Sequence, residues 1–289
     1  MREAETDQDA NYAHCEELLK AGNRPAWLAT LFAPADKRPF LHALGAFALE
    51  IAAVRGKVRE PLAGELRLQW WIDAIEGEAR GDVRGHPVAA ALIDTVRLAH
   101  LPRTTLTEMI EARRTDLYDD PLESLADYAA RADRIEGAAI ALAAQALGGQ
   151  RNPAIEAAAR HAGRVVAVAE TLRAFASPAT PMHMTVPLDL LRAQNIGAAE
   201  VLVRRSTPAI RAALAGLVAF GETEFSALRA ARRDIDVNAA PAFLTANLAP
   251  PLLKRALRHG LDPFTTPLAL PPWRQQWILW RASRRNGVF

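Results

Sequence analysis

The feature that most constrains this chain is the spacing of its apolar residues, which recur every three to four positions along nearly all of its 289 residues. That period is typical of helices with one buried face. No run of four to eight alternating Val, Ile, Thr or Tyr residues predicts a strand. Alanine is abundant, whereas there are only 16 Gly and 3 Tyr, which favours helix over sheet. The expected fold class is all-α.

Proline and glycine divide the periodic stretches into predicted helices. Their expected ranges are 10–21, 36–56, 62–80, 87–100, 103–117, 122–148, 153–176, 207–233, 238–258 and 270–285. No internal repeat or long flexible linker divides the chain, so one domain over residues 1–289 is predicted, with an N-terminal helix within 1–24 and a Trp- and Arg-rich helix within 270–289. Residues 138–144 have no polar face, so we expect them in the middle of a bundle.

Composition and motifs exclude several classes of protein. A net charge of +2 does not indicate nucleic-acid binding, and the single cysteine, Cys15, excludes an internal disulfide. Glycine-rich nucleotide loops, a His-Glu-x-x-His pair and a serine nucleophile elbow are absent. The longest uncharged apolar stretch, 138–147, is too short to cross a bilayer, and the acidic start resembles no leader. We therefore expect a cytoplasmic protein whose site, if any, is built on facing helices.

Three stretches follow one another in an informative order. The first is Arg67-Leu-Gln-Trp-Trp-Ile-Asp73, with His86-Pro87 after it, and the second is Met109-Ile-Glu-Ala-Arg-Arg-Thr-Asp-Leu117. The third runs from Gly163 through Leu172-Arg173 to Val186-Pro187-Leu188-Asp189. From about Pro25 to Leu257, this order resembles the squalene/phytoene synthase family of head-to-head prenyl transferases. The resemblance implies an isoprenoid-synthase-type helical bundle with a central, elongated cavity.

The family's chemistry depends on two aspartate-rich clusters. They hold Mg²⁺ against a prenyl diphosphate, because the metal neutralises the leaving diphosphate. The positions of this chain that the resemblance aligns with those metal ligands are Ala52, Ala53, Gly56, Ala174, Ser177 and Pro178. We therefore expect no metal and no other cofactor, with Mg²⁺ required only if the chain is an active prenyl transferase.

Two carboxylates remain close to those positions. Glu50 precedes Ala53 by three residues and Glu170 precedes Ala174 by four, so each shares a helix face with an aligned position. If the two helices face each other, these carboxylates meet across the cavity. The candidate cavity residues are Glu50, Arg67, Trp71, Asp73, Arg113, Asp116, Glu170 and Arg173. They form either a polar-ligand or one-metal site, or a buried Glu–Arg network that sets helix register, which is the commoner use of buried charges.

One branch of the family keeps the fold, lacks the acidic motifs and includes an assembly factor of respiratory complex I. Leu172-Arg173 and the segment after it resemble that branch. This implies a non-catalytic protein that assists assembly or binds lipid or isoprenoid, with a membrane-complex subunit as partner. The alternatives are an active prenyl transferase with relocated carboxylates, and a structural protein whose cavity is filled by side chains.

The predicted C-terminal helix carries tryptophans at Trp273, Trp277 and Trp280, which fall on one face. Arg281 and three other arginines lie beside this stripe or at its end. One interpretation is an interfacial helix, with tryptophans in the headgroup region and arginines on anionic lipid at the inner face of a membrane. The other is that the tryptophans close the bundle as core residues. Core packing is commoner at this spacing, so we expect it here.

Overall fold

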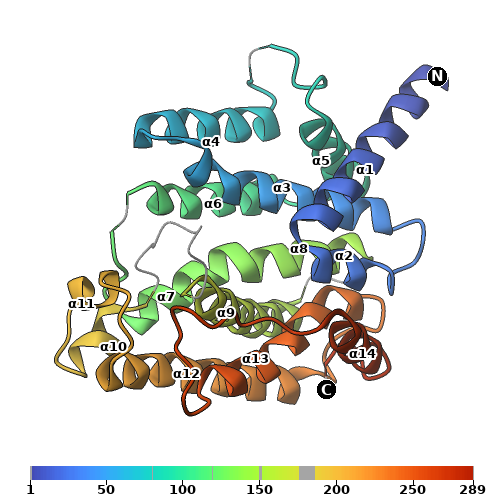
Figure 1. The fold of residues 1–289 in the computed structure, drawn as a ribbon. Coiled ribbons are helices and arrows are strands. Elements are labelled where there is room, and N and C mark those ends of the chain that lie inside the picture. Colours follow the sequence, from blue (N-terminus) through green and yellow to red (C-terminus); the bar gives the residue numbers. More distant parts are fainter. Residues whose placement is uncertain (1, 80, 119, 150–151, 176–185, 289) are drawn as a thin grey trace.

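The computed structural model describes residues 2–79, 81–118, 120–149, 152–175 and 186–288. Within these ranges every regular element is a helix, so the predicted all-α class is confirmed (Figure 1). Each predicted range corresponds to one or more observed helices. Their bounds are α1 Arg2–Gly22, α2 Arg24–Thr30, α3 Arg38–Lys57, α4 Pro61–Glu76, α5 Pro87–Leu98, α6 Arg103–Arg114, η1 Thr115–Leu117, α7 Leu125–Ala132, η2 Asp133–Gly137, α8 Ala138–Ala146, α9 Pro153–Phe175, α10 Leu188–Arg192, α11 Ala198–Leu202, α12 Pro208–Ala231, η3 Ala240–Leu248, α13 Ala249–Ala256 and α14 Pro272–Ser283.

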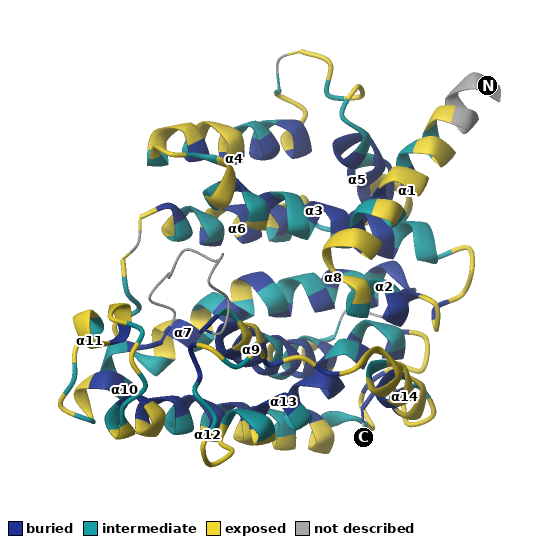
Figure 2. Ribbon diagram, viewed as in Figure 1, coloured by how far each residue is buried: buried dark blue, intermediate teal, exposed yellow. Residues whose placement is uncertain are grey.

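The long helices are stacked in layers, from α4 through α3 and α6 to α8, α9 and α12 (Figure 1). One hydrophobic core joins α1, α3, α4, α5 and α6 around Phe47, and another joins α9, α12 and α13 around Leu172. Between them lies α8, and none of residues 138–147 is exposed (Figure 2). The predicted central position of this apolar helix is therefore confirmed.

Two predicted helices have different internal geometry. The range 122–148 begins only after Ser124, whose hydroxyl caps the helix in a box with Asp127, and it contains a π-helical turn, η2. The range 238–258 splits into the 3₁₀ helix η3 and the α-helix α13, each with a proline in its first turn. Proline removes an N–H donor and fixes φ, so it starts a new helix rather than continuing one.

The shortest helices are not predicted by the periodicity. Helix α2 has seven residues, too few for two full turns of an apolar stripe, and it starts where the Asn23 side chain accepts a hydrogen bond from the Ala26 amide. Helices α10 and α11 have five residues each.

Two glycines bring η2 against α9. A Cβ atom added to Gly163 would lie 2.3 Å from the backbone nitrogen of Gly137, so the two backbones meet with no side chain between them. Beside this contact Arg164 donates two hydrogen bonds to Asp133, at 2.8 and 2.7 Å. The π-helical turn is therefore held in position by both a close backbone contact and an ion pair.

The expectation that the tryptophans of α14 pack in the core is wrong. Trp273, Trp277 and Trp280 are 68%, 54% and 44% exposed. The buried stripe of α14 is instead Ile278, Leu279 and Ala282, which lies on the opposite side of the helix, about 180° away at 100° per residue. Because that stripe already covers the neighbouring core, the tryptophan stripe faces outward. No helix of the described residues is long and apolar enough to cross a bilayer.

Candidate functional site

A cavity of about 360 Å³ lies between the two hydrophobic cores. Its wall comes from α1, α2, α3, α6, η2, α8, α9 and η3, and is mostly aliphatic, with Leu44, Ala48, Ile140 and Ala143 among its residues. This volume falls in the usual range for small-molecule sites, about 300–1,000 Å³. The central cavity expected from the sequence is present.

One part of the wall is charged, and it is made by a cluster of two arginines and two carboxylates from α6, η1, α7 and η2. Asp116 accepts hydrogen bonds from Arg131 at 2.7 Å and from Arg113 at 3.1 Å. Arg113 also lies 3.6 Å from a carboxylate oxygen of Glu136. We call these four residues the charged cluster; Arg113 and Glu136 line the cavity directly.

The two carboxylates of the charged cluster have opposite pKa shifts. Burial alone would raise the pKa of Asp116, but Arg131 and Arg113 outweigh it and hold that pKa below its usual value. For Glu136 burial dominates, and its pKa is raised although Arg113 and Arg131 partly offset the effect. Its Oε2 is buried without a hydrogen-bond partner among the described residues. Of the two carboxylates, Glu136 on the cavity wall is therefore the one whose burial is less fully offset by neighbouring arginines.

Replacing Glu136 with glutamine should stabilise the protein at neutral pH, by on the order of 1 kcal/mol. A carboxyl whose folded-state pKa is raised favours folding below its unfolded-state pKa of 4.5, and this contribution is lost as the pH rises through the folded-state value. Urea unfolding of both proteins from pH 4 to pH 8 measures the difference. It should be near zero at the acidic end and largest at the alkaline end. A variant that is less stable than the wild type at pH 8 would show that Glu136 is well compensated.

The structure brings some of the predicted site residues to the cavity. Arg113 and Glu170 line it, as does Ala52, one of the positions aligned with a metal ligand. Asp116 adjoins it through its ion pair with Arg113. Arg173 lines a neighbouring hollow of about 130 Å³ between α2, α9 and α13, which Glu170 also borders.

The other predicted residues lie elsewhere. Glu50 is absent from the cavity wall and pairs with Lys57 at 3.3 Å. Arg67 faces solvent because α4 is a peripheral helix that buries only one side. Trp71 is a core residue, with its ring 5.4 Å from that of Phe47. Asp73 accepts a hydrogen bond from Gln69 at 2.7 Å.

The expected meeting of Glu50 and Glu170 across the cavity does not occur. Glu170 accepts a hydrogen bond from Arg173, one turn along the same helix, at 2.9 Å, so each carboxylate is paired with a base of its own helix. Ser177 and Pro178 lie outside the described residues. Among the residues that are described, no three or more His, Cys, Asp or Glu side chains gather in a way that could hold a metal ion.

Sequence reasoning did not single out Glu136 or Arg131. The available signal was the run Arg131-Ala-Asp133-Arg134-Ile-Glu136, which places charges inside an otherwise apolar helix. Such residues usually have buried partners, but Arg113, the ion-pair partner of Glu136, comes from α6 and is brought to it only by folding.

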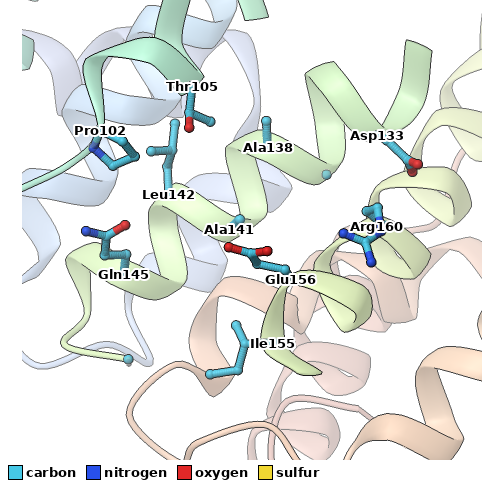
Figure 3. A pocket seen from close by; sticks show the side chains of 12 residues that line it. Pro102, Thr105, Asp133, Ala138, Ala141, Leu142, Gln145, Ile155, Glu156 and Arg160 are labelled. Carbon is cyan, nitrogen blue, oxygen red and sulfur yellow. The ribbon is translucent and has the colours of Figure 1, made fainter. Parts of the chain in front are cut away.

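A second, smaller hollow of about 170 Å³ lies on the other side of α8 (Figure 3). Ala138 and Ala141 form part of its floor, and Glu156 and Arg160 of α9 border it. Because both faces of α8 are rich in alanine, this helix separates two cavities instead of filling the space with large side chains. Asp133, which also borders the hollow, is already paired with Arg164.

Known proteins resemble this chain over almost its whole length. A complex I assembly factor 6 of Mus musculus is 26% identical over 254 residues, which are 88% of this chain and 76% of that protein. The protein of the same name from Homo sapiens is 25% identical over 251 residues, 87% of this chain and 75% of its own length. A homologue of that factor from Dictyostelium discoideum is 21% identical and covers 90% of this chain and 73% of its own length.

Solved structures show the same fold at lower identity. A dehydrosqualene synthase in complex with a ligand superposes with a TM-score of 0.75 at 16% identity, covering 96% of this chain and 97% of its own. Squalene synthase HpnC from Alicyclobacillus acidocaldarius has a TM-score of 0.66 at 18% identity, with 97% and 96% covered. The squalene/phytoene synthase family model matches residues 19–281, a longer range than the 25–257 expected from the sequence motifs. The chain therefore belongs to the squalene/phytoene synthase family.

Proposed function

We propose that this chain is a non-catalytic member of the squalene/phytoene synthase family that assists the assembly of a membrane respiratory complex. The observation that carries the proposal is its similarity, over nearly nine-tenths of the chain, to several proteins named as complex I assembly factor 6. A cytoplasmic protein at the inner face of the membrane would meet such a complex.

The chemistry of the cavity supports the non-catalytic part of the proposal. A prenyl diphosphate needs cations to neutralise its charge as it leaves, and in such enzymes jointly held Mg²⁺ ions supply them. Here two carboxylates at the cavity already pair with arginines: Asp116 pairs with Arg131, and Glu170 pairs with Arg173. The remaining one, Glu136, is largely buried, so its ionised form is disfavoured and it would be a poor metal ligand.

A second role, binding of an apolar ligand, is favoured by the cavity itself. About 360 Å³ of space bordered mainly by Leu, Ile and Ala side chains suits a lipid or isoprenoid chain. This role is compatible with assembly work, because a bound lipid would stabilise the fold without being consumed.

Assembly function is tested in the organism that encodes the chain. Deleting its gene should lower the amount of fully assembled respiratory complex on native gels, and re-expression should restore it. Re-expression of Glu50→Ala/Glu170→Ala should restore the assembled complex equally, because a non-catalytic protein does not need either carboxylate for chemistry. An unchanged amount of assembled complex in the deletion strain would contradict the assembly proposal.

Turnover is tested by diphosphate release from farnesyl and geranylgeranyl diphosphate with Mg²⁺. We expect no release under conditions in which an active squalene or phytoene synthase works. Mg²⁺-dependent release that is abolished in Glu50→Ala/Glu170→Ala would instead establish an active prenyl transferase with relocated ligands.

A further inference from the structure

Helix α14 presents an exposed aromatic face, which we call the tryptophan face: Trp273, Gln276, Trp277 and Trp280. These four side chains border one shallow surface hollow. The rings of Trp277 and Trp280 are stacked, with centroids 5.0 Å apart and an angle of 29° between their planes. The chain's other tryptophans are buried or half-buried, so the exposed indole surface is concentrated here.

The tryptophan face is not needed to hold α14 in place. The opposite stripe, Ile278, Leu279 and Ala282, is buried in the core. Helix α14 packs with that stripe against η3 and α2. Soluble proteins rarely expose contiguous apolar patches without a use for them, and such patches mark sites of interaction with membranes or other proteins.

Positive charge borders the tryptophan face. Residues 263–289 contain no Asp or Glu. Their basic residues, all exposed, are Arg274, Arg281, Arg284 and Arg285. The guanidinium of Arg284 lies 5.6 Å from the ring centroid of Trp280, so the charge borders the aromatic surface directly. The complementary surface is therefore one that is both apolar and anionic.

We propose that the tryptophan face binds the surface of an anionic phospholipid membrane, with α14 lying in the plane of the headgroups. Indole rings favour the headgroup region, because they combine an apolar body with an N–H donor, and arginines gain from anionic lipid nearby. A helix of twelve residues is about 18 Å long, too short to cross the hydrocarbon core but long enough to lie on it. This surface lies outside the cavity and does not depend on the assembly role.

The proposal is tested by flotation of the full chain with vesicles of phosphatidylcholine alone or mixed with phosphatidylglycerol. Binding should be strong only to the mixed vesicles and should weaken in high salt, because the Debye length falls from about 8 Å at 0.15 M to about 3 Å at 1 M. Tryptophan fluorescence should shift to shorter wavelength and be quenched by brominated lipid. Trp273→Ser/Trp277→Ser/Trp280→Ser should lower the affinity about tenfold or more.

A matched control replaces exposed leucines on another helix. Leu62 and Leu66 of α4 are both 66% exposed, and Leu62→Ser/Leu66→Ser should bind vesicles as the wild type does. Arg274→Gln/Arg281→Gln should reduce the preference for anionic vesicles while leaving α14 folded. Thermal unfolding of each variant verifies the fold.

Three outcomes would overturn the proposal. The first is that the wild type fails to float with anionic vesicles. The second is that the triple tryptophan variant floats as well as the wild type. The third is a concentration-dependent dimer of the wild type that the tryptophan replacements dissociate, which would show that a second copy of the chain covers this face.

Discussion

Replacing Asp116 with asparagine should cost about 3–5 kcal/mol of unfolding free energy at neutral pH, because it leaves buried arginine without its counter-charge. Asp116 accepts hydrogen bonds from both Arg131 and Arg113, and all three side chains are about four-fifths buried. Urea unfolding followed by circular dichroism measures the loss. Glu123→Gln is the matched control: Glu123 pairs with Arg192 at 2.9 Å, but both side chains are more than 60% exposed. That variant should lose no more than about 1 kcal/mol.

The pH dependence of the Asp116 effect has a definite sign. A carboxyl with a lowered folded-state pKa stabilises the fold above its unfolded-state pKa of 3.8, and this contribution is lost as the pH falls through the folded-state value. The gap between wild type and Asp116→Asn should therefore be widest at neutral pH and should shrink in acid. The Glu136→Gln difference should also fade in acid but has the opposite sign, because that variant is the more stable protein at higher pH. If the stability differences of the two variants from the wild type changed with pH in the same direction, the two carboxyls would not differ in environment.

Replacing Gly163 with alanine should cost about 3 kcal/mol or more, because the new methyl group would lie 2.3 Å from a backbone nitrogen and 2.6 Å from the Cα of Gly137. Backbone atoms cannot turn aside as a side chain can, so α9 and η2 must separate. The shift would also disturb the Arg164–Asp133 pair beside the contact. Thermal unfolding measures the loss.

The matched control for this prediction is Gly56→Ala, also in a helix. No atom lies within 4 Å of a Cβ at Gly56, and alanine favours helix over glycine, so stability should stay within about 1 kcal/mol and shift upward. If Gly163→Ala is as stable as Gly56→Ala, the close backbone contact is not a constraint on the fold.

Much of the architecture follows from local sequence signals. Several helix starts were predicted to within a few residues where a proline marks them, as at Pro61, Pro87 and Pro153, whereas the start of α2 and the break between η3 and α13 were not. The central position of α8 followed from its lack of a polar face. The π-helical turn could not be predicted from local sequence, because it depends on the contact between Gly137 and Gly163, which are far apart in sequence.

The candidate site was predicted only in part. Arg113 and Glu170 reach the cavity, but Glu50 turns to Lys57 on its own helix. The spacing of residues in a helix predicts which of them share a face. The direction in which that face points is set by how the helix packs against its neighbours. Glu136 was missed for the same reason, since its ion-pair partner Arg113 belongs to another helix.

By itself the sequence determined the helical class, most helix ends and the order of motifs that marks the family, because these depend on periodicity and on residues close together in the chain. Only the tertiary structure decided which charges surround the cavity and which side of α14 is buried. Both sides of α14 are apolar, with tryptophans on one and Ile278, Leu279 and Ala282 on the other. Hydrophobicity alone does not choose between two such sides; the fit of the smaller side chains against the core does.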